Sequence, residues 1–344
     1  MIYERVRRFL SEHIRGQASQ TTGRVALGSS VGRVRKENQD RAIVAEFIFP
    51  SEPSRDRIAL AVCDGIGGMA GGEAAAEMAA AEFVSAVFDG LGEPIEMVIQ
   101  HAAERANRLV FKEFKGKGGS TLVGAILDTW NAPVAISVGD SRVYAVDQWK
   151  ELLQLSRDDN LGALEKIGNI RVDPAQASHL TQFIGMGDGV EPNSIGVPEN
   201  SKRLILTSDG IHGMSAVVLR EFAIRIEDEL TLVQALIAAS NHLGGKDNSS
   251  AIVTRMPIQR PSLSTSDGLI VRLATPFAST EIWLPVPQRA LATEKARSSS
   301  PAELVRKAPR TRKSAPPSKR VREASPKVAP ATPELKLDFP GEEN

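Results

Sequence analysis

Residues 60–68 read LAVCDGIGG, and residues 72–88, GEAAAEMAAAEFVSAVF, follow three residues later. The apolar run predicts a buried strand over residues 58–63 that leads directly into Asp64. Glycine lets the chain turn sharply after the strand. Apolar residues spaced close to 3.6 apart then predict a helix over residues 72–88. The stretch is therefore a strand, a turn and a helix, with a carboxylate at the end of the strand.

Strands and helices occur in groups on either side of this stretch. Apolar runs rich in Val, Ile and Leu predict strands at residues 24–27, 41–49, 58–63, 121–127, 134–138, 143–146, 202–207 and 250–254. Helical spacing predicts helices at residues 72–88, 94–114, 216–226 and 230–243. This grouping favours an α+β fold of packed layers over strict βαβ alternation.

Composition sets limits on the class of protein. The chain has 344 residues, of which 42% are hydrophobic, and its length allows two or three domains. It contains no apolar stretch of the ~18–20 residues that a membrane helix needs, and its first residues do not resemble a secretory signal. The single cysteine, Cys63, excludes an internal disulfide and a cysteine-built zinc site. We therefore expect a cytoplasmic protein with no membrane partner.

The net charge of zero conceals an asymmetry between two parts of the chain. Residues 291–344 hold 12 basic and 7 acidic residues, which leaves 30 basic and 35 acidic residues in the rest. Residues 290–344 are rich in Ser, Pro, Ala, Lys and Arg, so we expect a disordered basic tail. Near its end, Leu335, Leu337 and Phe339 alternate with charged residues. This pattern suits either a short docking peptide or an ordinary disordered end.

Two further segments flank the predicted core. Residues 2–14 have the spacing of an amphipathic basic helix, which we expect to pack on the fold rather than anchor it to a membrane. Alternating apolar residues around TPFAST, within residues 269–286, predict an appended β-hairpin. The expected organisation is an N-terminal helix (1–21), a core domain (22–258), a hairpin (259–289) and the tail (290–344).

Four aspartates stand at predicted strand ends, each with glycine within three residues: Asp64, Asp140, Asp209 and Asp247. Taken singly, each Asp-Gly is most simply a turn. Gathered at one end of a sheet, however, these carboxylates would repel one another unless a cation lay between them. Ligation by oxygen alone favours magnesium, manganese or calcium over zinc. The repeated setting therefore predicts a site for hard divalent cations.

The glycine loop also fits the dinucleotide-binding pattern GxGxxG/A, since it follows a strand and precedes a helix. Asp64 would then face a pyrophosphate. The acidic residues about twenty positions on, Glu82 and Asp89, lie in or after the helix rather than at the end of a second strand. We therefore discount a dinucleotide site.

Six motifs in order carry a resemblance to a known family: GRVRKENQD (32–40), DGIGG (64–68), GST (119–121), GDSR (139–142), SDG (208–210) and DN (247–248). Together they resemble the metal-dependent serine/threonine protein phosphatase family, type 2C, in its bacterial form. The resemblance implies two packed antiparallel β-sheets flanked by helix pairs, an α-β-β-α sandwich. It also implies a centre of two manganese or magnesium ions, with a weaker third.

The resemblance assigns the metal ligands by motif position. Asp64 would bridge the two ions and the carbonyl of Gly65 would bind one of them. Asp209 and Asp247 would hold the other ion. Asp140, together with Asp209, would form the weaker third site.

Two further residues have implied catalytic roles. Arg35 would clamp the substrate phosphate, for which its planar fork suits bidentate contact with phosphate oxygens. Asp40 would orient water at the metal centre. The implied reaction is hydrolysis of phosphoserine or phosphothreonine in proteins by a metal-activated water, without a phosphoenzyme, in signalling opposed to a Ser/Thr kinase.

Departures from the family pattern leave a second interpretation open. Gln39 stands where many members have Glu, and Ile66 stands where some relatives have His. His212 and His242 lie near metal-site motifs, but we expect structural hydrogen bonds for both. The segment 143–207, which should hold the mobile flap of the family, matches only loosely. The alternative function is a catalytically weak phosphatase-fold module that recruits partners through its basic tail.

Other partners are expected to be absent. A metal-dependent nucleic-acid phosphodiesterase would use the same ions, but the body is acidic and the tail has no interleaved aromatic residues to stack on bases. We therefore expect a monomer that acts on phosphorylated protein and not on nucleic acid.

Overall fold

The computed structural model describes residues 2–11, 16–69, 71–129, 131–168, 171–256 and 268–284. The predicted tail, residues 290–344, lies outside this range. The helices are α1 Ile2–Ser11, α2 Gly72–Asp89, α3 Ile95–Phe114, α4 Leu161–Gly168, α5 Ala216–Arg225 and α6 Glu229–His242, with short 3₁₀ turns η1 Pro53–Arg55 and η2 Asp209–Gly213. The strands are β1 Gln17–Thr22, β2 Val25–Ser30, β3 Asp40–Ile48, β4 Arg57–Asp64, β5 Leu122–Asp128, β6 Val134–Val138, β7 Arg142–Asp147, β8 Leu152–Gln154, β9 Asn193–Gly196, β10 Ser201–Thr207, β11 Ser249–Arg255, β12 Leu269–Ala274 and β13 Ser279–Leu284.

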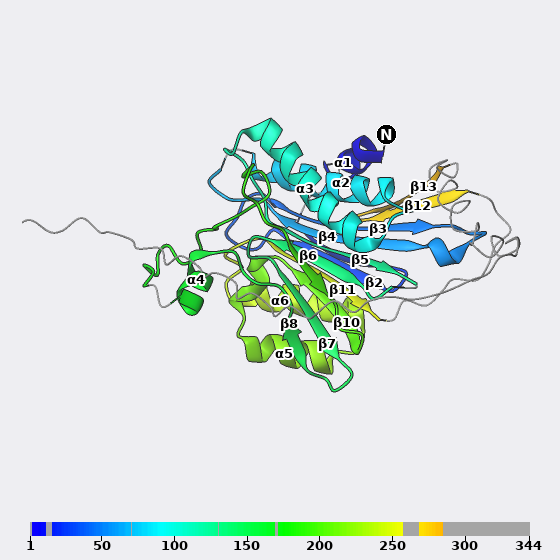
Figure 1. The fold of residues 1–344 in the computed structure, drawn as a ribbon. Helices are drawn as coiled ribbons and strands as arrows, with labels where there is room; N and C mark the ends of the chain where they lie inside the picture. Colours follow the sequence, from blue (N-terminus) through cyan, green and yellow to red (C-terminus); the bar gives the residue numbers. More distant parts are fainter. Residues whose placement is uncertain are drawn as a thin grey trace, which may run out of the picture. The chain divides into compact units, whose positions relative to one another are not determined.

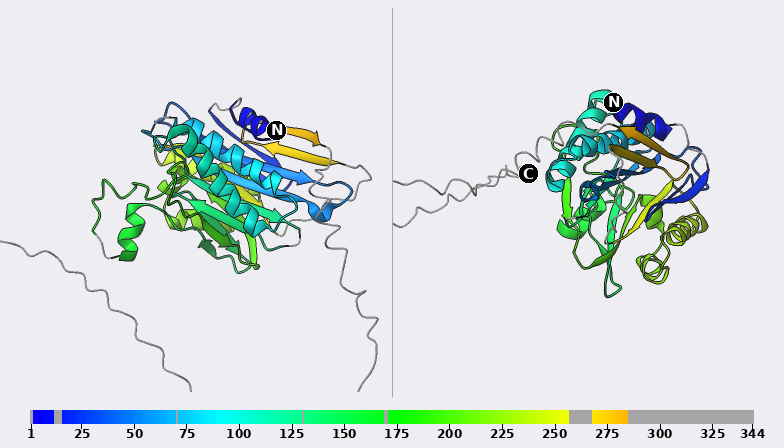
Figure 2. Two further views of the ribbon diagram at one scale, coloured as in Figure 1. Left: turned by 45° about the horizontal axis from the view of Figure 1, so that its top comes forward. Right: turned by 90° about the vertical axis from the view of Figure 1, so that its right-hand side faces the viewer.

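These strands form two antiparallel sheets that pack face to face (Figure 1). One sheet has the order β1-β2-β11-β10-β7-β8, and the other has the order β13-β12-β3-β4-β5-β6-β9. Figure 2 shows helices on both outer sides of this pair of sheets. Helices α1, α2 and α3 lie on the side of the β3–β4 sheet, and α5 and α6 lie on the side of the β2–β11 sheet. The predicted α-β-β-α sandwich is therefore confirmed.

Three layers of apolar side chains hold these four layers of structure together. One lies between the α2–α3 pair and its sheet, one between the two sheets, and one under α5 and α6. Strand β4 is buried on both faces, because it has a helix on one side and a sheet on the other. A strand in that position needs apolar residues at almost every position, which explains its unbroken run. Helix α2 owes its alanines to the same crowding, since alanine favours helix and packs closely.

The flanking segments fold largely as their patterns predict. Ile2, Val6 and Leu10 are buried, so α1 packs on the core. Strands β12 and β13 form the expected hairpin, and β12 pairs with β3, so the hairpin extends the sheet. Gln20 of β1 donates to the carbonyl of Ala278 at 2.8 Å and ties the hairpin to the other sheet. Within the described residues, no helix is long and apolar enough to cross a membrane.

Strand β1 is an element that the sequence does not indicate. Its residues, QASQTT, are polar and give no alternation of apolar and polar residues. The strand forms because it pairs along its whole length with β2, from Gln17 opposite Ser30 to Thr22 opposite Val25. As an edge strand it buries little, and it is held in place by its backbone hydrogen bonds to β2 rather than by its side chains.

Candidate metal centre

Five aspartates converge at one end of the sandwich: Asp40, Asp64, Asp140, Asp209 and Asp247. Asp40 begins β3 and lies opposite Asp64, the last residue of β4. Asp209 begins η2 directly after β10, and Asp247 lies just before β11, so these two come from the other sheet. Asp140 lies in the turn between β6 and β7. The predicted strand-end carboxylates are therefore brought together from both sheets.

The electrostatics of this cluster show how close the carboxylates are. Burial, and then the charges of Asp40 and Asp209, raise the pKa of Asp64 well above its ordinary value. Burial, with the charges of Asp247 and Asp40, raises the pKa of Asp209 to about 6. Burial and the charge of Asp209 also raise the pKa of Asp140 to about 6. The charges of Asp40, Asp209 and Asp247 thus make neighbouring carboxylates harder to ionise, a conflict that bound cations would relieve.

Two carboxylate oxygens of the cluster have no hydrogen-bond partner within the described residues: Oδ1 of Asp40 and Oδ1 of Asp209. The other oxygen of Asp40 accepts a hydrogen bond from the Ser208 hydroxyl at 2.7 Å. Unpartnered buried polar atoms are rare, and an ion ligand is one explanation for them. The oxygen-only donor set and the unpartnered oxygens both fit magnesium or manganese.

The carboxylates do not yet surround a single point. Within the described residues, no three His, Cys, Asp or Glu side chains are arranged to hold one ion. Asp247 is instead bound to Arg35, with Nη2 to Oδ2 at 2.6 Å. Magnesium keeps several waters and commonly binds through only one or two carboxylates, so this looser arrangement remains compatible with it.

The loop after Asp64 depends on a glycine at its first position. A Cβ atom added to Gly65 would lie 2.4 Å from the carbonyl oxygen of Gly72, so only glycine fits. The Gly65 amide donates to the carbonyl of Gln39 at 3.2 Å. The loop that follows β4 is thus held against the start of β3, beside Asp40.

Arg41 is a buried residue of the site that sequence reasoning missed. Its side chain is 2% exposed and donates to the carbonyls of Asn38 and Asp40, both at 2.8 Å. The same guanidinium donates at 2.7 Å to Glu73 and to Glu77, in the first two turns of α2. Arg41 therefore ties the turn that carries Asp40 to the helix that follows the glycine loop. The signal was a charged residue at the start of an apolar strand run.

Asn248 holds the other side of the same turn. Its Oδ1 accepts from the amide of Gln39 at 2.8 Å, and its Nδ2 donates to the carbonyls of Val31 and Glu37, both at 2.9 Å. Asn248, which directly precedes β11, thus holds the turn before β3 through its side chain. Asn248 was part of a quoted motif, but its sequence gave no indication of this clamp.

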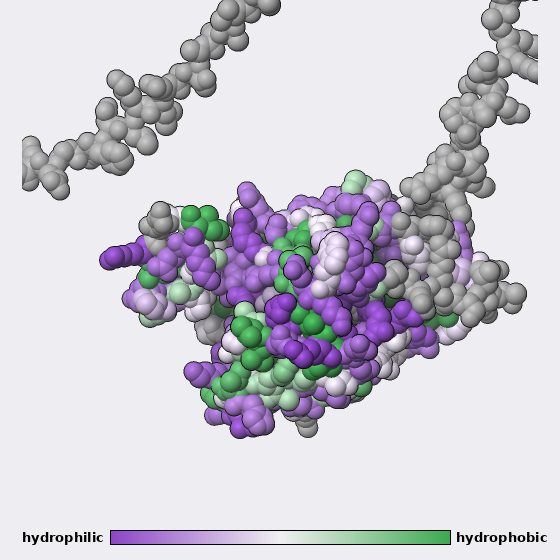
Figure 3. Space-filling model, turned by 90° about the horizontal axis from the view of Figure 1, so that it is seen from below, coloured by the Kyte–Doolittle hydropathy of each residue, from purple (hydrophilic) through white to green (hydrophobic). Residues whose placement is uncertain are grey.

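Asp140 borders the segment that contains α4. Asn160 Nδ2 lies 3.4 Å from Asp140 Oδ2, and Asp159 accepts from the Gly139 amide at 3.0 Å. Figures 1 and 3 show the α4 segment standing out from the body. Leu164 and Ile167 on α4 are exposed. The segment predicted to hold the flap therefore meets the centre at Asp140.

The two histidines near the site differ in their contacts. His212 is partly buried, and its Nε2 lies 3.1 Å from the Thr207 hydroxyl, so the expected structural hydrogen bond is confirmed. Burial lowers the pKa of His212 well below its ordinary value. His242 is exposed at the end of α6, and within the described residues its side chain makes no hydrogen bond, so the same expectation stays a prediction there.

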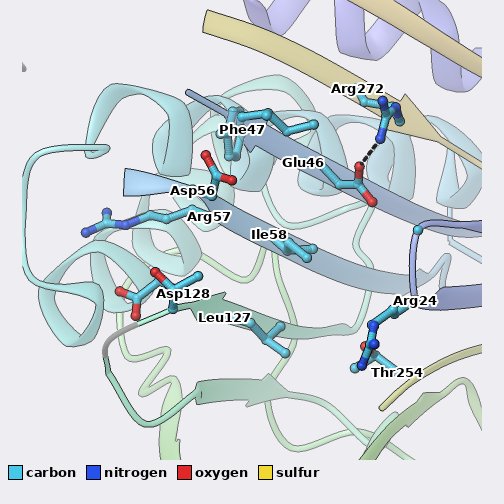
Figure 4. A pocket seen from close by; sticks show the side chains of 13 residues that line it. Arg24, Glu46, Phe47, Asp56, Arg57, Ile58, Leu127, Asp128, Thr254 and Arg272 are labelled. Atoms are coloured by element: carbon cyan, nitrogen blue, oxygen red, sulfur yellow. Dashed lines mark hydrogen bonds and ion pairs between the residues drawn. The ribbon is translucent and has the colours of Figure 1, made fainter. Parts of the chain in front are cut away.

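A separate hollow lies at the opposite end of the sheets (Figure 4). Its volume is about 310 Å³, and its lining includes Arg24, Glu46, Ile58, Leu127, Thr254 and Arg272. Arg272 and Glu46 form an ion pair at 2.7 Å, so those charged groups satisfy each other. Glu46 lies near the end of β3, whereas Asp40 begins that strand. The hollow is therefore remote from the carboxylates and does not belong to the candidate centre.

Comparison with known proteins agrees with the motifs. No family model matches the chain. The chain is 28% identical over 247 residues to protein phosphatase PhpP of Streptococcus pneumoniae, covering 67% of this chain and 97% of that protein. It is 28% identical over 251 residues to the serine/threonine phosphatase stp of Listeria monocytogenes, covering 68% and 96%.

A solved structure extends the comparison to the fold. The catalytic domain of the serine/threonine phosphatase PstP, in complex with two manganese ions, superposes with a TM-score of 0.55 at 24% identity. The match covers 70% of this chain and 98% of that one. The resemblance predicted from the motifs is therefore confirmed: the chain is similar, in sequence and in fold, to the metal-dependent serine/threonine phosphatases of type 2C.

Proposed function

We propose that this protein is a metal-dependent phosphatase that hydrolyses phosphoserine and phosphothreonine in proteins. The observation that carries the proposal is the convergence of Asp40, Asp64, Asp140 and Asp209, whose pKa values are raised by burial and by neighbouring carboxylates, with Asp247 among those neighbours. The curated relatives are named phosphatases over the same two thirds of the chain, which supports the activity.

Asp64, the Gly65 carbonyl, Asp209 and Asp247 would hold two manganese or magnesium ions, and Asp140 with Asp209 would hold a weaker third. When bound, these cations lower the pKa of a coordinated water and neutralise charge on the phosphoryl group. The cations would also remove the mutual repulsion of the carboxylates. The manganese pair in the PstP structure supports this choice of ion.

Arg35 would bind the phosphate of the substrate. Its guanidinium is partly exposed and lies against the glycine loop of the site, since a Cβ atom added to Gly67 would lie 3.1 Å from Arg35 Nη1. If Asp247 held a cation in place of Arg35, the guanidinium would be free to meet two phosphate oxygens. Asp40, 3% exposed and fixed by Ser208, would accept a proton from water or orient it for attack.

The alternative of a catalytically weak recruiting module is not favoured, because the relatives are named as phosphatases. Gln39 contributes its backbone to the site, through its amide to Asn248 and its carbonyl to Gly65. Replacement of Glu by Gln at this position therefore leaves the backbone of the site intact. An opposing Ser/Thr kinase, a monomeric state and a cytoplasmic location stay predictions.

The test is turnover of a phosphothreonine peptide with manganese, with and without chelator. We expect phosphate release that is lost on chelation and restored by added manganese or magnesium. Asp64→Ala should abolish turnover at metal concentrations that saturate the wild type, while circular dichroism shows an intact fold. Near-wild-type turnover by folded Asp64→Ala protein would show that the carboxylate cluster is not the catalytic centre.

A further inference from the structure

Two loops lie against each other beside the candidate centre, residues 31–37 and residues 243–247. The amide of Arg33 donates to the carbonyl of Gly245 at 2.7 Å, and the amide of Val34 donates to it at 3.2 Å. Gly32 has a φ of +80°, and a Cβ there would lie 2.4 Å from the carbonyl oxygen of Asp247. The close approach of the two loops therefore requires glycine at this position. The loops form one surface with a fixed shape.

Three cations stand on this surface next to Arg35: Arg33, Lys36 and Lys246, here called the basic rim. All three are exposed. Within the described residues none of their three side chains makes a hydrogen bond or ion pair, unlike the side chain of Arg35, which is bound to Asp247. Glu37 is the one acidic side chain of the first loop that is also exposed. The rim therefore carries an excess of unneutralised positive charge, although the body of the protein is net acidic.

Apolar side chains accompany these charges. Val34 lies between Arg33 and Arg35 and is 66% exposed, and Leu243 begins the second loop and is 58% exposed. The Val34 amide donates to the carbonyl of Gly245 in the second loop, so Val34 and Leu243 belong to the same joined surface. The joined surface therefore offers both positive charge and exposed aliphatic side chains to a bound peptide.

We propose that the basic rim recognises acidic residues that flank the phosphorylated residue of the protein substrate, with an apolar side chain of that substrate resting on Val34 and Leu243. The inference rests on the proposed function, because it places the phosphate at Arg35. An extended peptide advances about 3.3–3.6 Å per residue, so neighbours one to three positions from the phosphoresidue reach groups one or two residues from Arg35. Positive charge at that distance favours Glu and Asp at those positions and disfavours Lys and Arg.

The expected size of the effect follows from exposure. Each rim charge is solvated, so its pairing with one substrate carboxylate is worth about two- to five-fold in kcat/KM. Three such pairs together give roughly tenfold or more in favour of an acidic peptide. The preference should shrink at high salt, because exposed charges are screened within a Debye length of about 8–10 Å.

The experiment compares three phosphothreonine peptides that differ only at the flanking positions, with Glu, Gln or Lys there. They are assayed with manganese on the full chain, on the triple variant Arg33→Gln/Lys36→Gln/Lys246→Gln, and on a matched control, Lys112→Gln/Lys150→Gln/Lys202→Gln. The control removes the same charge from exposed positions that lie on other elements. The readout is the ratio of kcat/KM between peptides, at 50 and 300 mM salt.

We expect the wild type and the control to prefer the Glu peptide over the Gln peptide about tenfold at low salt, with the Lys peptide poorest. The rim variant should bring all ratios within about twofold. Equal ratios for wild type and rim variant, or the loss of preference in the control as well, would overturn the inference. Manganese-dependent hydrolysis of p-nitrophenyl phosphate by the wild type separates the two levels: its absence overturns the proposed function, and its presence without an acidic preference overturns only the rim.

Discussion

Arg35 and Asp247 are bound to each other, with Nη2 and Oδ2 only 2.6 Å apart, although one is predicted to meet a phosphate and the other a cation. Hydrogen bonding to Asp247 raises the pKa of Arg35, so the pair is electrostatically coupled. If Asp247 bound a cation, as we propose, Arg35 would lose this partner and could bind an anion. We therefore expect metal and phosphate binding to assist each other.

Replacement of Arg35 tests its role directly. Arg35→Ala should raise KM for a phosphopeptide about tenfold or more, because a charge-assisted hydrogen bond contributes about 1.5–3 kcal/mol. Arg35→Lys should recover only part of this loss, since an ammonium cannot make the bidentate contact. Steady-state kinetics at saturating manganese measure both variants. An unchanged KM in Arg35→Ala would leave Arg35 as a surface charge.

Neutralising a carboxylate of the cluster should cost activity and increase stability. Asp209→Asn should lower kcat by on the order of 10²-fold or more, since we propose Asp209 as a metal ligand. Burial and neighbouring charges raise the pKa of Asp209 to about 6. At pH 7 Asp209 is therefore ionised in surroundings that disfavour its charge, which lowers the stability of the native state. In chelator, the free energy of unfolding of Asp209→Asn should therefore exceed that of the wild type by on the order of 1–2 kcal/mol.

Urea unfolding of both proteins in chelator, and again with manganese, measures this second effect. With manganese the order should reverse, because binding to the native state stabilises the wild type more. A variant that is less stable than the wild type in chelator would contradict the account of mutual repulsion.

Arg41 gives a prediction about a buried guanidinium. Arg41→Met leaves Glu77 without its partner in a buried setting, and removal of one member of a buried pair costs about 3–5 kcal/mol. Arg105→Met is a matched control, because Arg105 also joins two carboxylates, Glu82 and Asp89, but from a partly exposed position. The control should cost no more than about 1 kcal/mol.

Thermal unfolding measures the stabilities of both variants. Arg41 also fixes the carbonyls of Asn38 and Asp40. Folded Arg41→Lys protein should therefore need a higher manganese concentration than the wild type for half-maximal activity. Equal manganese dependence for wild type and Arg41→Lys would limit Arg41 to a structural role.

Asp56 provides a pH dependence away from the centre. Burial raises its pKa to about 6, from an ordinary value of 3.8, while it accepts the Phe49 amide at 2.7 Å. Between these two values the native state holds more protons than the unfolded state, so the contribution of Asp56 to stability falls as pH rises from about 4 to 6. Above about pH 7 it is constant.

The measurement is the difference in unfolding free energy between wild type and Asp56→Asn across pH 4–8. The wild type should lose stability relative to the variant as pH rises through this window, and the difference should be flat above pH 7. A difference that is constant from pH 4 to 7 would show that Asp56 titrates normally.

The sequence predicted a layered α+β fold and its strand-end carboxylates because both leave strong local patterns, whereas the α-β-β-α sandwich followed from the family resemblance. Strand β4 is an unbroken apolar run, and Asp64 ends it beside glycine, so position and chemistry are both visible. Strand β1 was not predicted, because its order comes from pairing with β2 rather than from its own polar residues.

Contacts between distant side chains explain the rest of what was missed. Arg41 meets Glu77 across 36 residues, and Asn248 meets the Gln39 amide across 209. Neither distance leaves a trace in the local pattern of residues. The same is true of the pairing of Arg35 with Asp247, which joins two residues whose separate roles the motifs did indicate.

Because the clustered carboxylates come from two different sheets, the order of events during folding determines when the site forms. Asp40 and Asp64 belong to β3 and β4, whereas Asp209 and Asp247 flank β10 and β11 of the other sheet. Neither sheet alone carries all of the carboxylates that we propose as ligands. During refolding, catalytic competence should therefore lag behind the regain of secondary structure, and the interval between them would time the docking of one sheet on the other.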